Sequence, residues 1–148
     1  ASPYSPASDG QGGMIWLEYS ERGAGRVVRV TPGRVTPVST AAVETAIQGY
    51  GGTAIQNAVG YMYSSQGHYF YVLSFPAAGD QWVYDLTLDA WHRRVTWTTI
   101  NGATSMPPGY LHAVTFDGRN YVMDVNGNIY VQSETTFTDN GTAQVARR

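Results

Sequence analysis

Short runs of alternating apolar and polar residues, separated by turn-forming residues, occupy most of the chain. The first two runs, MIWLEYS (14–20) and RVVRVT (26–31), flank the Gly-containing loop ERGAG and predict a β-hairpin. The stretch GRVTPV that follows predicts a short third strand. Pro37 places this strand at a sheet edge, because proline has no N–H to donate to a further neighbour. We therefore expect a first antiparallel meander over residues 13–38.

A second meander is predicted between residues 58 and 97, where four β-rich runs alternate with three short turns. The runs are AVGYMY, HYFYVLSF, QWVYD and WHRRVTW, and the turns are SSQG, PAAGD and LTLDA. The run HYFYVLSF is apolar at both its odd and its even positions, which indicates a strand that is buried on both faces. The pattern predicts a four-stranded antiparallel sheet.

A third unit of the same kind is predicted over residues 109–133. Its strands GYLHAVTF, RNYVMDV and NIYVQS are joined by two dipeptides, Asp117 with Gly118 and Asn126 with Gly127. Both dipeptides favour two-residue type I′ hairpin turns, in which both central residues need a positive φ.

Consecutive antiparallel units of about 40 residues are typical of a β-propeller, in which each unit is one blade. We predict an all-β, β-propeller-like fold with three antiparallel meander blades and one short helix. Residues 1–13, rich in Pro, Ser and Gly, are expected to be a flexible lead-in, and residues 14–148 a single β-propeller-like domain. Because a closed propeller needs about four to eight blades, we expect this domain to be part of a larger propeller or to be covered by other subunits.

The helix is predicted near residues 40–49, within STAAVETAIQGYGG. Ser39 or Thr40 would cap its N-terminus, and Val43 and Ile47 lie four positions apart on one face. The glycines of GYGG are expected to end it.

At the centre of the second blade, Trp82 and Tyr84 fall on one face of the third strand and Asp85 ends that strand. We expect the Asp85 carboxylate to accept backbone N–H groups of the turn LTLDA. Trp91 is expected to begin the outer strand and to cover the hairpin. We interpret Trp82, Tyr84, Asp85 and Trp91 as a structural blade motif.

Composition argues against nucleic-acid binding, a membrane span and cysteine-based sites. The net charge is −2, and the nine basic residues are all Arg and scattered, so we expect no direct nucleic-acid binding. The chain has no run of 18 apolar residues and therefore no predicted membrane span. The absence of cysteine excludes disulfides and thiolate metal sites.

Candidate catalytic and metal-binding residues are few. His68, His92 and His112 are too far apart in sequence to form a helix-borne metal pair, and each is interpreted as structural. Asp124 begins a stretch that resembles a calcium loop, but Ile129 stands where that loop needs Gly, so a hairpin turn is favoured. We predict no metal and no cofactor.

An active site is not predicted either. No G-x-S-x-G stretch occurs, and Asp85 and Asp89 lie in a tight turn where hydrogen bonding to the backbone explains them. A propeller hydrolase would become the better interpretation if a pocket gathered Asp85, Asp89 and an Arg. We therefore predict that the chain is not an enzyme.

The eleven Tyr and four Trp exceed what a small core requires. Aromatic side chains are enriched at protein interfaces, and they also serve as stacking platforms for sugars. The residues themselves leave both interpretations open.

Several stretches together resemble the packaged-DNA stabilisation proteins, a tail-hub or tail-accessory-factor family of short-tailed bacteriophages and prophages. They are RVTPVSTAAVETAIQGY, GHYFYVLSFP, WVYD followed by WHRR, HAVTFDGRNYVMDVNGNIY and the late TDNG. The resemblance covers roughly residues 14–148. Proteins of this family are longer, so the resemblance implies a portion or a shortened relative.

The resemblance implies a structural virion protein without catalytic residues or cofactors. It would be made in the bacterial cytoplasm and reside in the phage tail. There it would form a homo-oligomeric ring beneath the portal and adaptor ring, close the channel after DNA packaging, and dock tail plug or fibre proteins. A lectin-like carbohydrate-binding β-propeller module is the alternative.

An open set of three blades should expose its first and last strands and at least one Tyr-rich face. We expect the edge regions 14–31 and 119–133 to make subunit or inter-domain contacts. Loops 64–67, 76–80 and 101–109 are candidates for contacting a plug or fibre protein, and the isolated piece should be marginally stable or self-associating.

Overall fold

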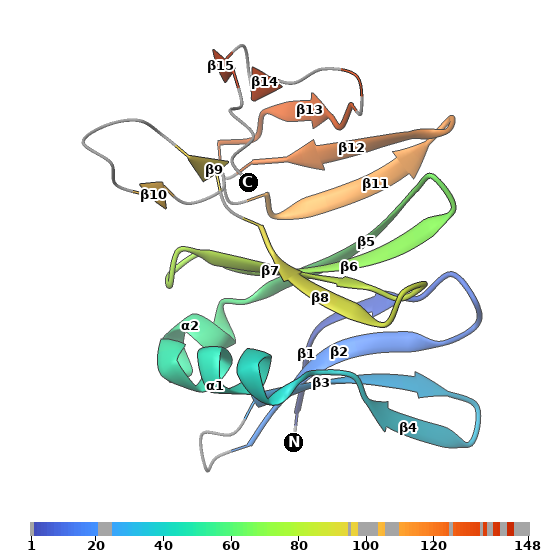
Figure 1. The fold of residues 1–148 in the computed structure, drawn as a ribbon, viewed down its shortest axis with the longest axis vertical. Coiled ribbons are helices and arrows are strands. Elements are labelled where there is room, and N and C mark those ends of the chain that lie inside the picture. The colour runs from blue at the N-terminus through green and yellow to red at the C-terminus, as the bar shows by residue number, and fades with distance from the viewer. Residues whose placement is uncertain are drawn as a thin grey trace.

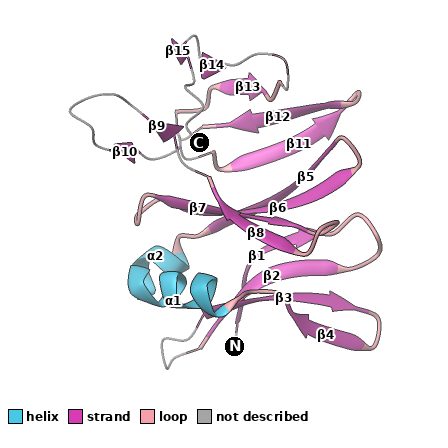
Figure 2. Cartoon of the chain, in the orientation of Figure 1, coloured by secondary structure: helices cyan, strands magenta, loops and turns pink. Residues whose placement is uncertain are grey.

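The structure of the chain is a computed structural model that describes residues 2–20, 25–94, 96–97, 104–105, 110–124, 126–133, 135, 138–139 and 142–143. Most of these residues form antiparallel β-strands, as Figure 2 shows, so the predicted all-β class is confirmed. Three sheets of this kind are stacked one above another in Figure 1, and we call them the first, second and third blade.

The first blade contains four strands in the order β1-β2-β3-β4. Their bounds are β1 Ser2–Ser8, β2 Met14–Tyr19, β3 Gly25–Thr31 and β4 Arg34–Pro37. The edge position of β4 is as predicted from Pro37. Strand β1 corrects the expectation of a flexible lead-in, because it pairs with β2 from Ser2 opposite Tyr19 to Ser8 opposite Met14.

Polar contacts explain how a Pro- and Ser-rich segment becomes a strand. The Asp9 carboxylate accepts the N–H groups of Gln11 and Gly13 at 2.8 and 2.7 Å, which fixes the turn into β2. Ser5 is held from the second blade, since the Tyr71 hydroxyl donates to its carbonyl oxygen at 2.8 Å. Hydrogen bonds therefore replace the apolar side chains that the sequence pattern lacks here.

The second blade contains four strands in the order β5-β6-β7-β8, as predicted. Their bounds are β5 Val59–Ser65, β6 His68–Phe75, β7 Asp80–Asp85 and β8 Ala90–Arg93. The last predicted run, WHRRVTW, is divided: β9 Thr96–Trp97 leaves the blade and pairs with β10 Thr104–Ser105. The Arg94 N–H makes the last backbone bond to β7, at the Gln81 carbonyl.

Two helices lie between the first and second blades, on one side of the stack (Figure 1). Helix α1 spans Ala41–Tyr50 with Thr40 as its N-cap, and its buried residues are Val43 and Ile47. The prediction of a single helix is wrong, because α2 follows over Gly52–Gln56. Gly51, with φ of 79°, ends α1 as expected, but the chain turns there and begins a second helix that buries Ala54 and Ile55.

The third blade contains β11 His112–Phe116, β12 Arg119–Met123 and β13 Ile129–Val131. Asp117 and Gly118, with φ of 48° and 69°, form the predicted two-residue turn between β11 and β12. A short separate hairpin follows, with β14 Thr138–Asp139 paired to β15 Thr142–Ala143.

The turn between β12 and β13 differs from the predicted two-residue type I′ hairpin at Asn126 and Gly127. The backbone N–H of Asp124 donates to the carbonyl of Asn128 at 3.0 Å and the N–H of Gly127 donates to the carbonyl of Asp124 at 3.2 Å, so the turn closes between Asp124 and Asn128, with Gly127 at φ of 82°. The Asp124 side chain accounts for this, because its carboxylate accepts the N–H groups of Asn126 and Asn128 and so draws Asp124 into the turn.

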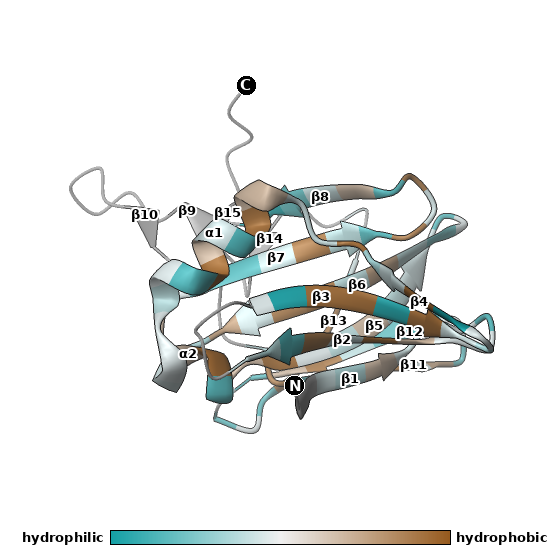
Figure 3. Ribbon diagram, turned by 90° about the horizontal axis from the view of Figure 1, so that it is seen from below, coloured by the Kyte–Doolittle hydropathy of each residue, from teal (hydrophilic) through white to brown (hydrophobic). Residues whose placement is uncertain are grey.

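The blades pack face to face through two apolar cores. One core joins the first blade and the helices to the second blade, and Tyr71, Leu73 and Tyr84 belong to it. The other lies on the opposite face of the second blade, where Tyr61, Val72 and Val83 meet the third blade. Strand β6 is thus buried on both faces, as its sequence predicted. The change of hydropathy along individual strands is visible in Figure 3.

The first strands of the three blades follow one another through the stack, because β1 contacts β5 and β5 contacts β11. This arrangement is that of consecutive blades in a β-propeller, whose sheets are placed radially around one axis.

Candidate functional site

Two residues of the blade motif, Trp82 and Trp91, fasten the second blade to its neighbours, and Asp85 holds a turn within the blade. The Trp82 indole donates to the Tyr50 hydroxyl at 2.9 Å, and that hydroxyl donates to the Asp80 carboxylate at 2.5 Å. Burial, followed by the contact with Asp80, raises the pKa of Tyr50 to about 12. Trp82 therefore ties helix α1 to β7.

Asp80 is the centre of this cluster and was missed by the sequence reasoning. It is buried, and both of its oxygens accept from the Arg93 guanidinium, at 2.7 Å from Nε and 2.6 Å from Nη2. The hydrogen bonds from Arg93 to Asp80 raise the pKa of Arg93. The sequence marks Asp80 only by its position, since it begins a strand after the turn PAAG, two residues before Trp82.

Tyr84 and Trp91 stack with ring centroids 5.0 Å apart. The Tyr84 hydroxyl donates to Asp89 in the turn at 2.7 Å, and the Trp91 indole donates to the Val38 carbonyl of the first blade at 2.7 Å. Trp91 was expected to cover the hairpin of its own blade, and its ring lies on Tyr84 of the neighbouring strand there. Its indole N–H also fixes the second blade to the first.

Asp85 holds the turn that follows β7. Its carboxylate accepts the N–H groups of Thr87 at 2.8 Å and Leu88 at 3.2 Å, and its second oxygen lies 2.7 Å from Nδ1 of His68. Burial alone would raise the pKa of Asp85, but these hydrogen bonds bring it below its ordinary value. The contact with His68 joins the ends of β6 and β7, and no sequence signal pointed to it.

The other two histidines occupy different places. His92 lies edge-on to Phe70 at 6.4 Å, and burial is the main cause that lowers the pKa of His92. His112 is exposed on β11. Among the described residues, no group of three His, Cys, Asp or Glu side chains is placed to hold a metal ion.

Asp124 is surrounded by donors. Its oxygens accept from the side-chain amide of Asn128 and from the Tyr130 hydroxyl, both at 3.0 Å, besides the two backbone N–H groups of its turn. Led by the Asn128 side chain, these hydrogen bonds lower the pKa of Asp124. A carboxylate whose lone pairs take N–H and O–H groups organises a turn, and it does not resemble a calcium ligand.

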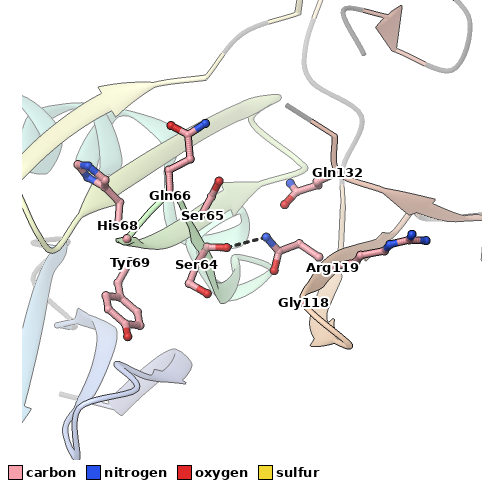
Figure 4. A pocket seen from close by; sticks show the side chains of 10 residues that line it. Ser64, Ser65, Gln66, His68, Tyr69, Gly118, Arg119 and Gln132 are labelled. Atoms are coloured by element: carbon pink, nitrogen blue, oxygen red, sulfur yellow. Dashed lines mark hydrogen bonds between the residues drawn. The ribbon is translucent and has the colours of Figure 1, made fainter. Parts of the chain in front are cut away.

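A polar cleft of about 520 Å³ lies between the second and third blades. The hairpin of β5 and β6 and the hairpin of β11 and β12 form its walls, and the Asn120 side-chain amide crosses it to the Ser64 carbonyl at 2.7 Å (Figure 4). His68 and Arg119 lie at opposite ends and point away from each other. The lining residues that the structure describes do not include Asp85 or Asp89, so the gathering that would favour a hydrolase is not seen.

The loops proposed as docking elements are placed as follows. Residues 64–67 line the cleft. Residues 76–79 form the turn between β6 and β7, and Asp80 beyond them is buried. Of loop 101–109, only Thr104–Ser105 lie within the described residues.

The outward faces of the first and third blades carry exposed apolar side chains. On the third blade they are Val114, Phe116, Ile129 and Val131, which are 60%, 71%, 69% and 50% exposed. The expectation of an uncovered face is met, but this face is rich in Val, Phe and Ile rather than in Tyr.

Neither described helix is long and apolar enough to span a membrane. A family model described as bacteriophage P22 Gp10, beta-propeller, of the phage-stabilisation type, matches residues 7–137. No curated protein matches the chain.

Proposed function

The chain belongs to the phage-stabilisation β-propeller family of bacteriophage P22 Gp10, and we propose that it works in the phage tail. There it closes the portal channel after DNA packaging and docks plug or fibre proteins. Membership of this family makes it a bacteriophage structural protein with a DNA-stabilisation role. The match over residues 7–137 is the observation that carries the proposal, and the tail position and docking role are the parts that need testing.

The use of polar side chains supports a structural role. The buried carboxylates of Asp9, Asp80, Asp85 and Asp124 all accept hydrogen bonds that fix turns or join elements. In an active site such groups would instead face a cleft that binds the substrate. Several acids and bases with strongly shifted pKa values would meet in that cleft. In this chain the same groups stiffen the blades, which suits a protein that closes a channel against the pressure of packaged DNA.

Stabilisation of the DNA is proposed to work by closure of the channel, without direct DNA binding. The chain has a net charge of −2, and Arg26, Arg29 and Arg93 are engaged with Glu18, Asp9 and Asp80. A protein that grips phosphates needs a stripe of free basic side chains.

Docking of a plug or fibre protein is proposed at the polar cleft. The two hairpins that form it present backbone and amide groups along one side of the blade stack, where a partner can add hydrogen bonds.

The cleft is also the one observation that favours a carbohydrate-binding module as second candidate. Against this candidate, the indole N–H groups of Trp82 and Trp91 are occupied inside the protein, and Trp91 is stacked on Tyr84. A glycan array with a specific, Trp-dependent signal would favour the lectin function over the tail function.

The proposed function is tested in the phage that encodes the chain. We expect particles that lack the protein to package DNA and then lose it, so that nuclease digests DNA that is protected in wild-type particles. Supplying the wild-type protein in trans should restore protection. Particles that retain DNA without the protein would refute channel closure while leaving family membership intact.

A further inference from the structure

Strand β1 connects the first blade to the second. It pairs with β2 of its own blade and contacts β5 of the second blade. At its middle, the Ser5 hydroxyl donates to the Ala58 carbonyl at 2.6 Å, and the Tyr71 hydroxyl donates to the Ser5 carbonyl at 2.8 Å. These two side-chain hydrogen bonds, both at Ser5, tie β1 to the second blade.

The pairing of β1 with β2 is interrupted at its centre. The register shifts between Tyr4 and Ala7, where Ser5 and Pro6 lie. Ser5 has a φ of 54°, a left-handed conformation that is strained for a residue with a Cβ atom. Pro6, like Pro3, has no N–H to donate to a neighbouring strand. The backbone ladder of β1 is therefore weaker than that of a regular strand of the same length.

Apolar burial adds little to the docking of residues 5–8. Ala7 packs against the core between the first and second blades, whereas Pro6 and Ser8 are exposed. The neighbouring strand β2 contributes Ile15 and Leu17 to the same core, and both are fully buried. Because burial of large apolar side chains is the main stabilising contribution to folding, β2 is held far more strongly than this part of β1.

The turn that follows β1 is fixed independently of it. The buried Asp9 carboxylate accepts the backbone N–H groups of Gln11 and Gly13 and is also bound by Arg29 of β3. The backbone N–H of Asp9 donates to the Gly13 carbonyl at 2.9 Å. These partners lie in the turn and in β3, so the turn keeps its shape when β1 moves. The boundary of a moving segment therefore lies directly before Asp9.

We propose that β1 detaches as one unit while the rest of the first and second blades stays folded. Segments that bury few apolar groups open locally, with a free energy well below that of global unfolding. Detachment breaks the ladder to β2 and both hydrogen bonds at Ser5. It frees the edge of β2 that is paired in the closed form, and a free strand edge can pair with another strand. Detachment of β1 does not depend on the location of the protein in a tail.

The test is native-state hydrogen exchange of the full chain, read by mass spectrometry of its peptides at urea concentrations below the unfolding transition. A local opening exposes little surface, so its free energy depends weakly on urea, whereas that of global unfolding depends steeply on urea. We expect the amides of residues 2–8 to exchange faster than those of β2 and β3, and almost independently of urea. The amides of β2 and β3 should show the steep dependence.

Tyr71→Phe removes the hydroxyl that holds the Ser5 carbonyl. This variant should speed the exchange of β1 by about two- to tenfold, the effect of one neutral hydrogen bond, and should leave its weak urea dependence unchanged. Ser5→Ala, which removes the bond to Ala58, takes its place if circular dichroism shows that Tyr71→Phe is unfolded.

Tyr61→Phe is the matched control. The Tyr61 hydroxyl is buried without a hydrogen-bond partner in the described part of the chain, and its side chain belongs to the core that faces the third blade. The surroundings of Tyr61 are therefore the same whether β1 is bound or detached. This variant should leave the opening of β1 unchanged.

Exchange of residues 2–8 that is as slow and as dependent on urea as that of β2 overturns the proposal, since β1 would then open only on global unfolding. Equally weak urea dependence in β1 and β2 also overturns it, because the whole hairpin would then open together. Fast exchange that neither Tyr71→Phe nor Ser5→Ala changes overturns it as well, since the strand would then fray without releasing Ser5. The same holds if Tyr61→Phe speeds the exchange of β1 as much as Tyr71→Phe does.

Discussion

The substitution Asp80→Asn tests whether the cluster around Asp80 holds helix α1 against the second blade. An amide keeps the shape of the side chain and one acceptor oxygen, but its NH₂ group cannot accept the bonds that Oδ2 accepts from Tyr50 and Arg93. The variant therefore loses two hydrogen bonds at a side chain that is 4% exposed.

The two lost bonds contribute differently to the free energy of unfolding. The bond from the Tyr50 hydroxyl goes to a charged, buried acceptor, and such bonds contribute about 1.5–3 kcal/mol. The Arg93 side chain is 55% exposed, so its pairing with Asp80 contributes about 0–1 kcal/mol. We expect Asp80→Asn to lower the free energy of unfolding by about 1.5–4 kcal/mol, and Arg93→Gln to lower it by about 1 kcal/mol or less.

The assay is urea denaturation followed by tryptophan fluorescence and circular dichroism at one fixed protein concentration, because self-association would change the apparent stability. Added salt should weaken the difference between wild type and Arg93→Gln, and it should leave most of the Asp80→Asn effect. Two results would refute this assignment of energies. One is an equal loss of unfolding free energy in Arg93→Gln and Asp80→Asn, and the other is an Asp80→Asn variant whose stability lies within about 0.5 kcal/mol of wild type.

Two further predictions concern acid stability and the placement of β1. Burial alone would raise the pKa values of Asp9 and Asp85, but hydrogen bonds to their carboxylates lower both below 3.8. Their stabilisation is therefore present above pH 3.8 and is lost as the pH falls through the folded-state pKa. Urea midpoints between pH 7 and pH 2 should fall less steeply for Asp9→Asn and Asp85→Asn than for wild type, and parallel curves would contradict this. Gly60→Ala should lower the free energy of unfolding by about 1–3 kcal/mol, because its Cβ would lie 2.5 Å from the Ser5 carbonyl oxygen and force β1 away from β5. Gly49→Ala, at a glycine with open space around its Cβ position and no positive φ, isolates the effect of crowding, and equal losses in the two variants would contradict it.

Much of the fold could be predicted from the sequence because the blades obey local rules. The burial of β6 on both faces follows from its continuous apolar run, and the Asp117–Gly118 turn follows from that dipeptide. Strand β1 could not be predicted this way, since its order comes from contacts with residues far along the chain, such as Tyr71.

The polar network of the second blade illustrates the same limit. The position of Asp85 at a strand end indicated a turn-holding role, but its partner His68 is 17 positions away in sequence. Asp80 depends on Tyr50 and Arg93, which only the fold brings together. Local propensity places the turns, whereas long-range packing decides which carboxylates become buried.

The most direct test of the proposed role is a cryo-electron microscopy map of the virion tail from the phage that encodes this chain. The account predicts density for the three stacked blades at the base of the portal channel, in several copies around the tail axis and in contact with the plug. Blade density elsewhere in the particle, or its absence from the virion, would contradict the account.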